Sequence, residues 1–243
     1  MALALAAGGT ANALHLQIGK LRINATASIS PSELPAKGQA PVEVTSVVRI
    51  STSDGAAPPK LRTLTLQFDK HGSLDTRGLP TCSATKLAGT TTKEARTACP
   101  KAIVGEGTGR AVVNLPGLPR QAVSSPLILF NAAPDGGRPT LLVHAYETVP
   151  APNTLLTPIV IERINGGRYG YRAQIELPEI AGGYGAATLS KATIGATRKR
   201  GGRTVGYANA YCSGGRLQVY GTLAFEGGGF TNGTLVQPCH SAD

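Results

Sequence analysis

The stretch IVIERINGGRYGYRAQI, residues 159–175, decides the fold. Asn165 and Gly166 lie between two apolar runs, and this dipeptide favours the tight turn of a β-hairpin. On each side of it apolar side chains recur at every second position, which is the period of a strand with one buried face. The stretch therefore predicts two antiparallel strands joined at residues 165–167.

The same alternation recurs along the chain, and 31 glycines and 17 prolines supply turns between the runs. Val42, Val44, Val48 and Ile50 share one face of a strand, and Leu64, Leu66 and Phe68 share one face of another. Further strands are expected at residues 102–115, 127–131, 140–147, 187–197, 204–212 and 216–225. Many short strands with regular turns, and no alternation with helices, predict an all-β fold: an antiparallel β-sandwich or a barrel-like form of it.

Helix formers are concentrated only in residues 83–98, where Gly89 is expected to divide them into two short turns. Residues 25–38 and 53–59 carry the composition of loops. Neither is long enough for an interdomain linker, so residues 14–243 are predicted to form a single β-rich domain, with division into two subdomains left open.

The N-terminal stretch MALALAAGGTANA, Met1 to Ala13, is apolar and ends in the small residues that signal peptidase requires. We predict a truncated signal peptide that is cut after Ala13; the alternative is a frayed tail of a protein that is not exported. Elsewhere the chain has no apolar run of the roughly 18 residues that a membrane span needs, so no transmembrane segment is expected.

The four cysteines form two pairs that are local in sequence. Four thiols allow three connectivities, of which we predict Cys82–Cys99 and Cys212–Cys239. The spacing of a zinc site is absent, and His240 beside Cys239 is the only adjacent histidine, so no metal is expected. Disulfides form outside the cytoplasm, which supports a secreted or cell-envelope location.

A resemblance to known proteins is carried by the segment from Gly78 to Gly109. Its matching residues are Leu79, Pro80, Cys82, Cys99, Pro100, Val104, Gly105 and Gly107. The segment resembles uncharacterised secreted β-rich proteins of actinobacteria and their relatives, in which Leu-Pro-x-Cys leads into a short helix, then Cys-Pro and a Val-Gly-x-Gly strand. The resemblance implies export, the Cys82–Cys99 bridge and a β-rich fold, and it implies no activity.

The composition and the distribution of charge indicate which classes of partner the protein could bind. Hydrophobic residues make up 41% of the chain and charged residues 16%, which excludes a charge-rich disordered protein. The net charge of +10 is scattered except for Arg198, Lys199, Arg200 and Arg203 beside the turn residues Gly201 and Gly202. These four cations predict a hairpin tip that contacts an anionic cell-wall polymer; the alternative is a solvated tip. No aromatic side chains are interleaved, so sequence-specific recognition of nucleic acid is not expected.

Two motifs suggest chemistry. Residues 105–109, GEGTG, resemble a phosphate-binding glycine loop, but a strand pattern follows where that loop needs a helix. Asp69, His71 and Asp75 lie close together, and an acid beside a histidine can orient it as a general base. The alternative is an exposed turn between strands, and no nucleophile motif accompanies the histidine.

A ligand site is the remaining hypothesis. His144 and Tyr146 share a strand face with Leu142, and Tyr169 and Tyr171 could add a surface on which a carbohydrate stacks. The alternative for these tyrosines, and for Tyr207 and Tyr211, is the core, since the chain has little other aromatic mass.

These observations rank three functions. First is a noncatalytic secreted or cell-envelope protein with a structural or adhesive role. Second is a module that binds carbohydrate or a small molecule, and third is a hydrolase that uses His71 or His144. No cofactor is expected for the leading function.

Overall fold

The computed structural model describes residues 13–242. The predicted signal peptide lies outside these residues except for Ala13, which is the first residue of a strand. The strands are β1 (Ala13–Ile18), β2 (Leu21–Ser30), β3 (Glu33–Pro35), β4 (Ala40–Pro41), β5 (Glu43–Thr52), β6 (Leu61–Asp69), β7 (Gly72–Leu74), β8 (Ile103–Val113), β9 (Gln121–Asp135), β10 (Arg138–Glu147), β11 (Asn153–Gly166), β12 (Tyr169–Glu176), β13 (Gly185–Ile194), β14 (Thr197–Arg200), β15 (Arg203–Gly206), β16 (Ala208–Ala210), β17 (Arg216–Phe225), β18 (Phe230–Pro238) and β19 (His240–Ala242). The helices are α1 (Ala84–Leu87) and α2 (Thr92–Ala98), with short 3-10 turns η1 (Pro100–Ala102) and η2 (Ile180–Gly183).

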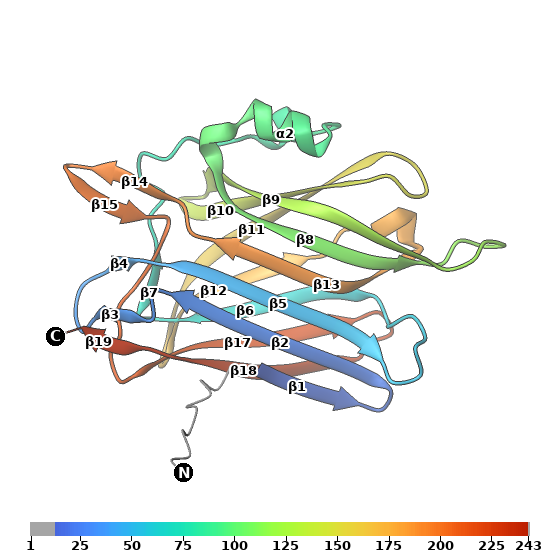
Figure 1. Cartoon of the computed structure of the whole chain (residues 1–243), viewed down its shortest axis with the longest axis horizontal. Helices are drawn as coiled ribbons and strands as arrows, with labels where there is room; N and C mark the ends of the chain where they lie inside the picture. Colours follow the sequence, from blue (N-terminus) through green and yellow to red (C-terminus); the bar gives the residue numbers. More distant parts are fainter. Residues whose placement is uncertain (1–12, 243) are drawn as a thin grey trace, which may run out of the picture.

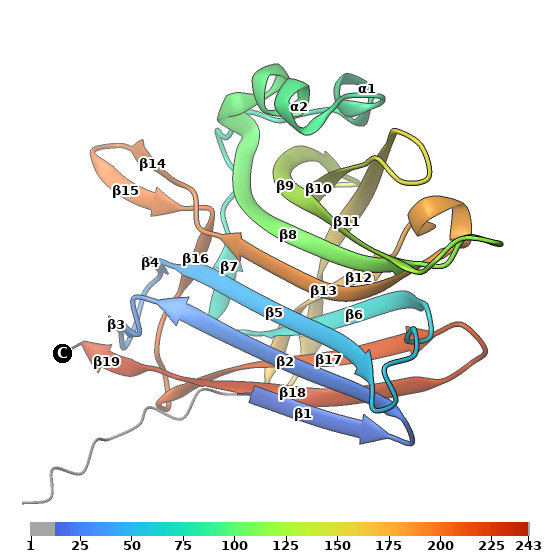
Figure 2. The same ribbon diagram turned by 45° about the vertical axis from the view of Figure 1, so that its right-hand side comes forward.

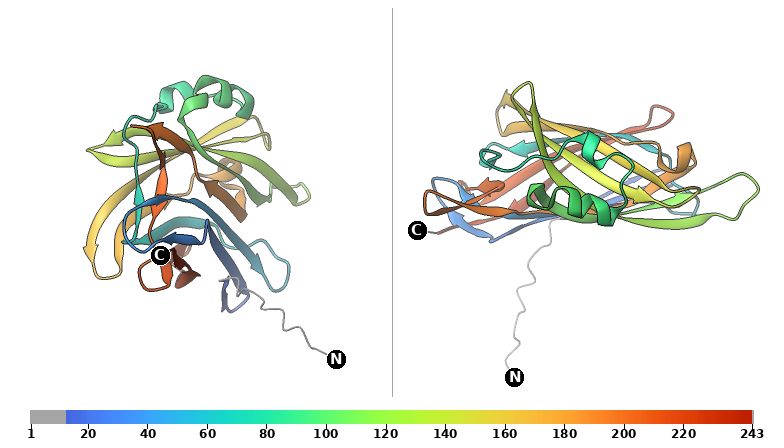
Figure 3. Two further views of the ribbon diagram at one scale, coloured as in Figure 1. Left: turned by 60° about the vertical axis from the view of Figure 1, so that its left-hand side comes forward. Right: turned by 90° about the horizontal axis from the view of Figure 1, so that it is seen from above.

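Twelve of the strands form one antiparallel sheet, in the order β1-β2-β5-β13-β8-β9-β10-β11-β12-β6-β17-β18. The sheet curls around its own interior until β18 lies beside β1 and β2 (Figures 1 and 3). At this seam the side chain of Leu14 fills the space that a Cβ on Gly233 would need. The all-β prediction is therefore confirmed, in its barrel-like form, as a nearly closed sheet.

The interior is filled by the alternating aliphatic faces. One cluster joins Val104, Leu129, Leu141 and Ile161 around the fully buried ring of Tyr207. A second joins Ile23, Ile50, Leu61, Leu223 and Phe225 near the seam. Burying a side chain of this size contributes roughly 1.5–3 kcal/mol, so these two clusters stabilise the fold substantially.

The hairpin at residues 159–175 forms, but its turn lies at Gly167 and Arg168, because Asn165 and Gly166 still belong to β11. β11 and β12 pair antiparallel around a turn in which Gly167 has a φ of 57°, a value that L side chains rarely adopt. Ile161 and Ala173 are directly opposite each other and both lie in the interior cluster. The faces predicted for residues 42–50 and 64–68 are also confirmed, since Ile50 and Val42 are buried and Phe68 and Leu64 pack against the core.

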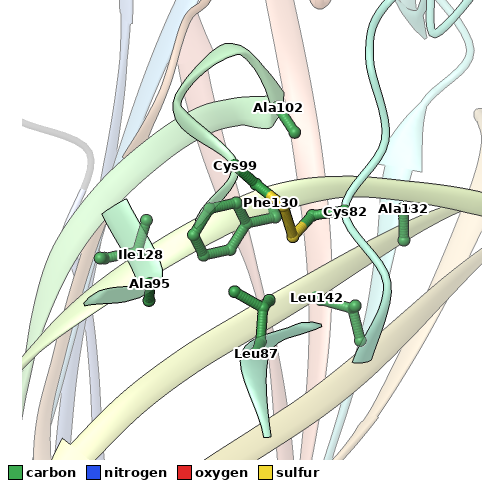
Figure 4. Packing of buried hydrophobic residues seen from close by; sticks show 9 residues of the cluster. All are labelled: Cys82, Leu87, Ala95, Cys99, Ala102, Ile128, Phe130, Ala132 and Leu142. Carbon is green, nitrogen blue, oxygen red and sulfur yellow. A yellow bond between two sulfur atoms is a disulfide. The ribbon is translucent and has the colours of Figure 1, made fainter. Parts of the chain in front are cut away.

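The helical insertion covers the outer surface of β9 and β10 (Figures 1 and 3). It divides into α1 and α2 around Gly89, as predicted, and a capping box between Thr91 and Glu94 starts α2. The predicted Cys82–Cys99 disulfide is present, and its sulfurs lie against the ring of Phe130, with Leu87 and Leu142 close by (Figure 4). The insertion thus has a small core of its own on the outside of the sheet.

The second predicted disulfide, Cys212–Cys239, is also present. It belongs to a buried cluster with Leu34, Val42 and Leu217, at the end of the sheet where the C-terminal strand β19 pairs in parallel with β3. In the chain-entropy view each bridge contributes about 3 kcal/mol by shortening the loops of the unfolded chain. The bridges therefore fix the insertion and the C-terminal tail to the sheet.

Another prediction about local structure is wrong. Residues 25–38 were expected to be a loop, but β2 extends to Ser30 and β3 follows at Glu33–Pro35. The register of β2 with β5 is continuous from Leu21 to Ser30, so pairing with a long neighbour outweighs the low strand preference of its alanines. Residues 53–59 do form the predicted loop, without strand or helix.

Candidate functional site

The basic tip is the hairpin β14–β15, with Gly201 and Gly202 in its turn as predicted. It projects from the end of β13, away from the body of the sheet (Figures 1 and 2). Lys199, Arg200 and Arg203 are exposed, whereas Arg198 is half-buried. The four predicted cations are therefore not equivalent.

Arg198 anchors the hairpin to the body. Its guanidinium donates to the Asp75 carboxylate at 3.0 Å and to the backbone oxygens of Asp75 and Arg77 at 3.1 and 2.7 Å. Its side chain is 14% exposed, and that of Asp75 is 11% exposed. Because both terminal nitrogens of its guanidinium are engaged in these contacts, Arg198 serves the structure of the hairpin more than it serves a partner.

The carboxylate of Asp75 forms ion pairs with three neighbouring arginines. Besides Arg198, it accepts from Arg77 and lies 2.9 Å from Arg200 Nη1. Burial alone raises the pKa of this carboxyl, but the hydrogen bonds of Arg77 and the charges of Arg200 and Arg77 outweigh burial and lower the pKa to about 2. Asp75 is therefore ionised at neutral pH and holds the base of the tip.

The end of the tip keeps two cations without a carboxylate partner among residues 13–242. Lys199 Nζ donates to Thr204 Oγ1 at 2.8 Å, and no ion pair of the described residues includes Arg203. Arg203 is opposite Arg200 in the ladder. Like charges that are directly opposite on two strands destabilise the pair, so this arrangement does not serve the stability of the hairpin.

Asp69 and His71 do come together, as the sequence suggested. His71 Nδ1 lies 2.9 Å from Asp69 Oδ1, and their side chains are 10% and 4% exposed. The alternative of a turn between strands is also correct, since residues 70–71 join β6 to β7. Asp69 and His71 are nevertheless buried, and the ring of Tyr211 lies 4.7 Å from the imidazole. Asp75, the third residue of the motif, points to the tip instead.

Asp69 has further partners that the sequence did not reveal. Its Oδ2 lies 2.7 Å from Arg168 Nε and accepts from the backbone amide of Gln218 at 3.0 Å. Arg168 also donates to the backbone oxygen of Arg216. Asp69 therefore joins the β6–β7 turn, the β11–β12 turn and β17, which is a structural role.

His144 lies beneath the helical insertion and is fully buried. Its Nε2 is 3.0 Å from the backbone oxygen of Thr90, which can only accept, so the proton is on Nε2. Thr154 Oγ1 donates to the same oxygen at 2.7 Å. Burial lowers the pKa of His144, although the bond to Thr90 opposes this shift, so the ring is neutral at neutral pH.

The proposed ligand residues lie on two faces of the sheet. His144 and Tyr146 alternate with the interior residues of β10 and share the outer face with Leu142, which packs against the insertion. Tyr171 packs against the interior cluster, and Arg163 stacks on its ring at 5.8 Å. Tyr169 contacts Tyr220, with ring centres 6.2 Å apart. The two pairs do not form one site, and ligand binding by either stays a prediction.

Residues 105–109 do not form a phosphate loop, in agreement with the strand pattern of the sequence. These residues lie inside β8, and no helix follows them. A Cβ on Gly105 or Gly107 would clash with the backbone oxygens of Thr193 and Lys191 on β13. The glycines therefore allow two neighbouring strands to approach closely.

Two other kinds of site are absent from the described residues, and no known protein indicates a partner. Among residues 13–242 no group of three or more histidine, cysteine, aspartate or glutamate side chains is arranged to hold a metal. No helix in this part of the chain is long and apolar enough to cross a membrane. Comparison with protein-family models, curated proteins and solved structures found no match.

Proposed function

We propose that the protein is an exported, noncatalytic component of a bacterial cell envelope or secretome with a structural or adhesive role. It contacts an acidic wall polymer through the exposed cations of the tip, Lys199, Arg200 and Arg203.

The observation that carries the proposal is the placement of Arg203. It is exposed at the end of a projecting hairpin and opposite Arg200, with no carboxylate partner in the described part of the chain. A polyanion passing over the tip would relieve the repulsion between these arginines, so binding and hairpin stability would favour each other. Attraction of this kind is electrostatic and depends on salt.

The compartment has independent support. Two disulfides, with no free cysteine in residues 13–242, indicate an oxidising, extracytoplasmic environment. The small-residue motif that ends at Ala13 and the resemblance to secreted actinobacterial proteins agree with export by a signal peptide.

The hydrolase alternative has weaker support. The carboxylate of Asp69 is shared among His71, Arg168 and the amide of Gln218. His144 is closed off by Thr90 and the insertion. A general base needs a hydrogen-bond path to its substrate, so both histidines fit packing roles better.

The test is binding of the full chain to purified poly(glycerol phosphate) and polygalacturonate at low salt. K199Q/R203Q removes two tip charges, and K37Q/K101Q removes two exposed charges elsewhere as a matched control. We expect the tip variant to bind about 5- to 20-fold more weakly, since each exposed contact contributes up to about 1 kcal/mol. Equal affinity of the two double variants, or no binding by the unmodified protein, would refute the proposal.

A further inference from the structure

We infer that the outer face carries a second anion site, a groove lined by Arg49, Arg110 and Arg120 that takes a phosphate or carboxylate group. The existence of the site does not depend on the proposed function. Only the identification of a wall polymer as the molecule that carries this group rests on it. The groove lies where β5, β13 and β8 run side by side, at the end of the sheet opposite the tip (Figure 2).

The register of the sheet places Arg49 and Arg110 at the same height along their strands. On β13, Leu189 is paired with Arg49 of β5 on one side and with Arg110 of β8 on the other. Strands are spaced about 4.8 Å apart, so the two arginine backbones are about 10 Å apart and their long side chains can reach one ligand. Both point outward, because their neighbours Ile50 and Ala111 are buried in the interior.

The third arginine comes from the loop that follows β8. Arg120 Nη1 donates to the backbone oxygen of Gly55 at 2.7 Å. This bond joins the loop after β8 to the loop after β5 and forms a wall of the groove. It engages one of the five N–H donors of the guanidinium, so Arg120 keeps donors for an anion.

The three arginines differ from most others in having no acidic partner. The ion pairs of residues 13–242 include Arg62, Arg77, Arg96, Arg138, Arg168, Arg172, Arg198 and Arg200. None includes Arg49, Arg110 or Arg120, and no aspartate or glutamate lines the groove. Three cations in one hollow repel each other, and an anion is what offsets this repulsion.

The shape and the other lining groups indicate the ligand. The hollow has a volume of about 410 Å³, which is in the usual range for small-molecule sites. Ser51, Thr52 and Thr188 add hydroxyls, and Leu189 adds an aliphatic surface between the two arginines. A guanidinium binds two oxygens of a phosphate or carboxylate at once, and hydroxyls suit sugar or glycerol oxygens. The groove therefore fits one acidic repeat of a glycopolymer.

The test is an NMR titration of the ¹⁵N-labelled full chain with inorganic phosphate and, separately, with galacturonate. We expect saturable shifts at the amides of Arg49, Leu189 and Arg110. R49Q/R110Q should weaken this binding about 10-fold or more, since it removes two charge-assisted contacts. The control R163Q/R216Q removes two exposed arginines outside the groove and should leave the affinity within about two-fold.

The outcomes separate the two proposals. Shifts with phosphate alone identify a phosphate-bearing ligand, and shifts with galacturonate alone identify a uronate. Absence of saturable shifts in the groove, or equal weakening by both double variants, overturns the groove site. Saturable phosphate binding together with no polymer binding by the unmodified protein overturns the proposed function and leaves the groove site standing.

Discussion

Replacement of Arg198 by alanine should release the tip from the body of the protein. The change removes three hydrogen bonds, one to the Asp75 carboxylate and two to backbone oxygens. All three bonds are donated by a charged guanidinium, and a bond of this kind contributes about 1.5–3 kcal/mol, but the contributions are not additive and Asp75 keeps Arg77 and Arg200. We therefore expect docking of the hairpin to weaken by about 2–3 kcal/mol.

Hydrogen exchange of the peptide that spans residues 197–206 measures this effect locally. A loss of 2–3 kcal/mol accelerates exchange by local opening about 30- to 150-fold. R203A is the matched control, because it removes an arginine of the same hairpin that has no carboxylate partner in the described chain, and its exchange should change little. Equal exchange rates in the two variants would show that Arg198 does not hold the hairpin, and the division of the four cations into anchor and contact groups would fail.

Three other predictions concern stability. The pKa of Asp75 is lowered from 3.8 to about 2, so its contribution to the stability of the docked hairpin is complete above pH 3.8 and is lost as the pH falls toward about 2. The protection of residues 197–206 from hydrogen exchange should therefore decrease between these two pH values. The pKa of His144 is lowered from 6.5, so the free energy of unfolding should decrease as the pH falls below 6.5, and urea titrations should find this dependence reduced in H144Q. L87A opens a cavity under the insertion and should lower the free energy of unfolding in urea by about 3 kcal/mol. L118A, on an exposed loop, should lower it by less than about 0.5 kcal/mol. Equal losses in the two variants would contradict the packing of Leu87.

Much of the fold could be predicted because its signals are local. The hairpin of β11 and β12 and the division of the insertion at Gly89 depend on residues within a few positions of each other. The sequence does not predict β2 and β18 as complete strands, because polar and apolar residues mix on both of their faces. Pairing with a neighbouring strand determines that these residues are extended. Asn232 and Gly233 have the composition of a turn, yet they lie inside β18, where Gly233 makes room for Leu14 at the seam.

The candidate sites show the same division. The contact of Asp69 with His71 spans two positions and could be predicted, whereas Arg198 and Asp75 are separated by 123 positions. His144 has the sequence pattern of a ligand residue, but its partner in the insertion that covers it, Thr90, lies 54 positions earlier. The arginine groove gave no sequence signal, because its residues come from separate strands and loops.

The most direct measurement of the proposed function is the salt dependence of binding to purified poly(glycerol phosphate). Three exposed cations at the tip predict that the logarithm of the association constant falls linearly with the logarithm of the salt concentration, with a slope of about −2 to −3. K199Q/R203Q should reduce the magnitude of this slope by about 1.5 to 2, and K37Q/K101Q should not change it. Binding that is independent of salt, or a slope that K199Q/R203Q leaves unchanged, would contradict polymer contact through the tip.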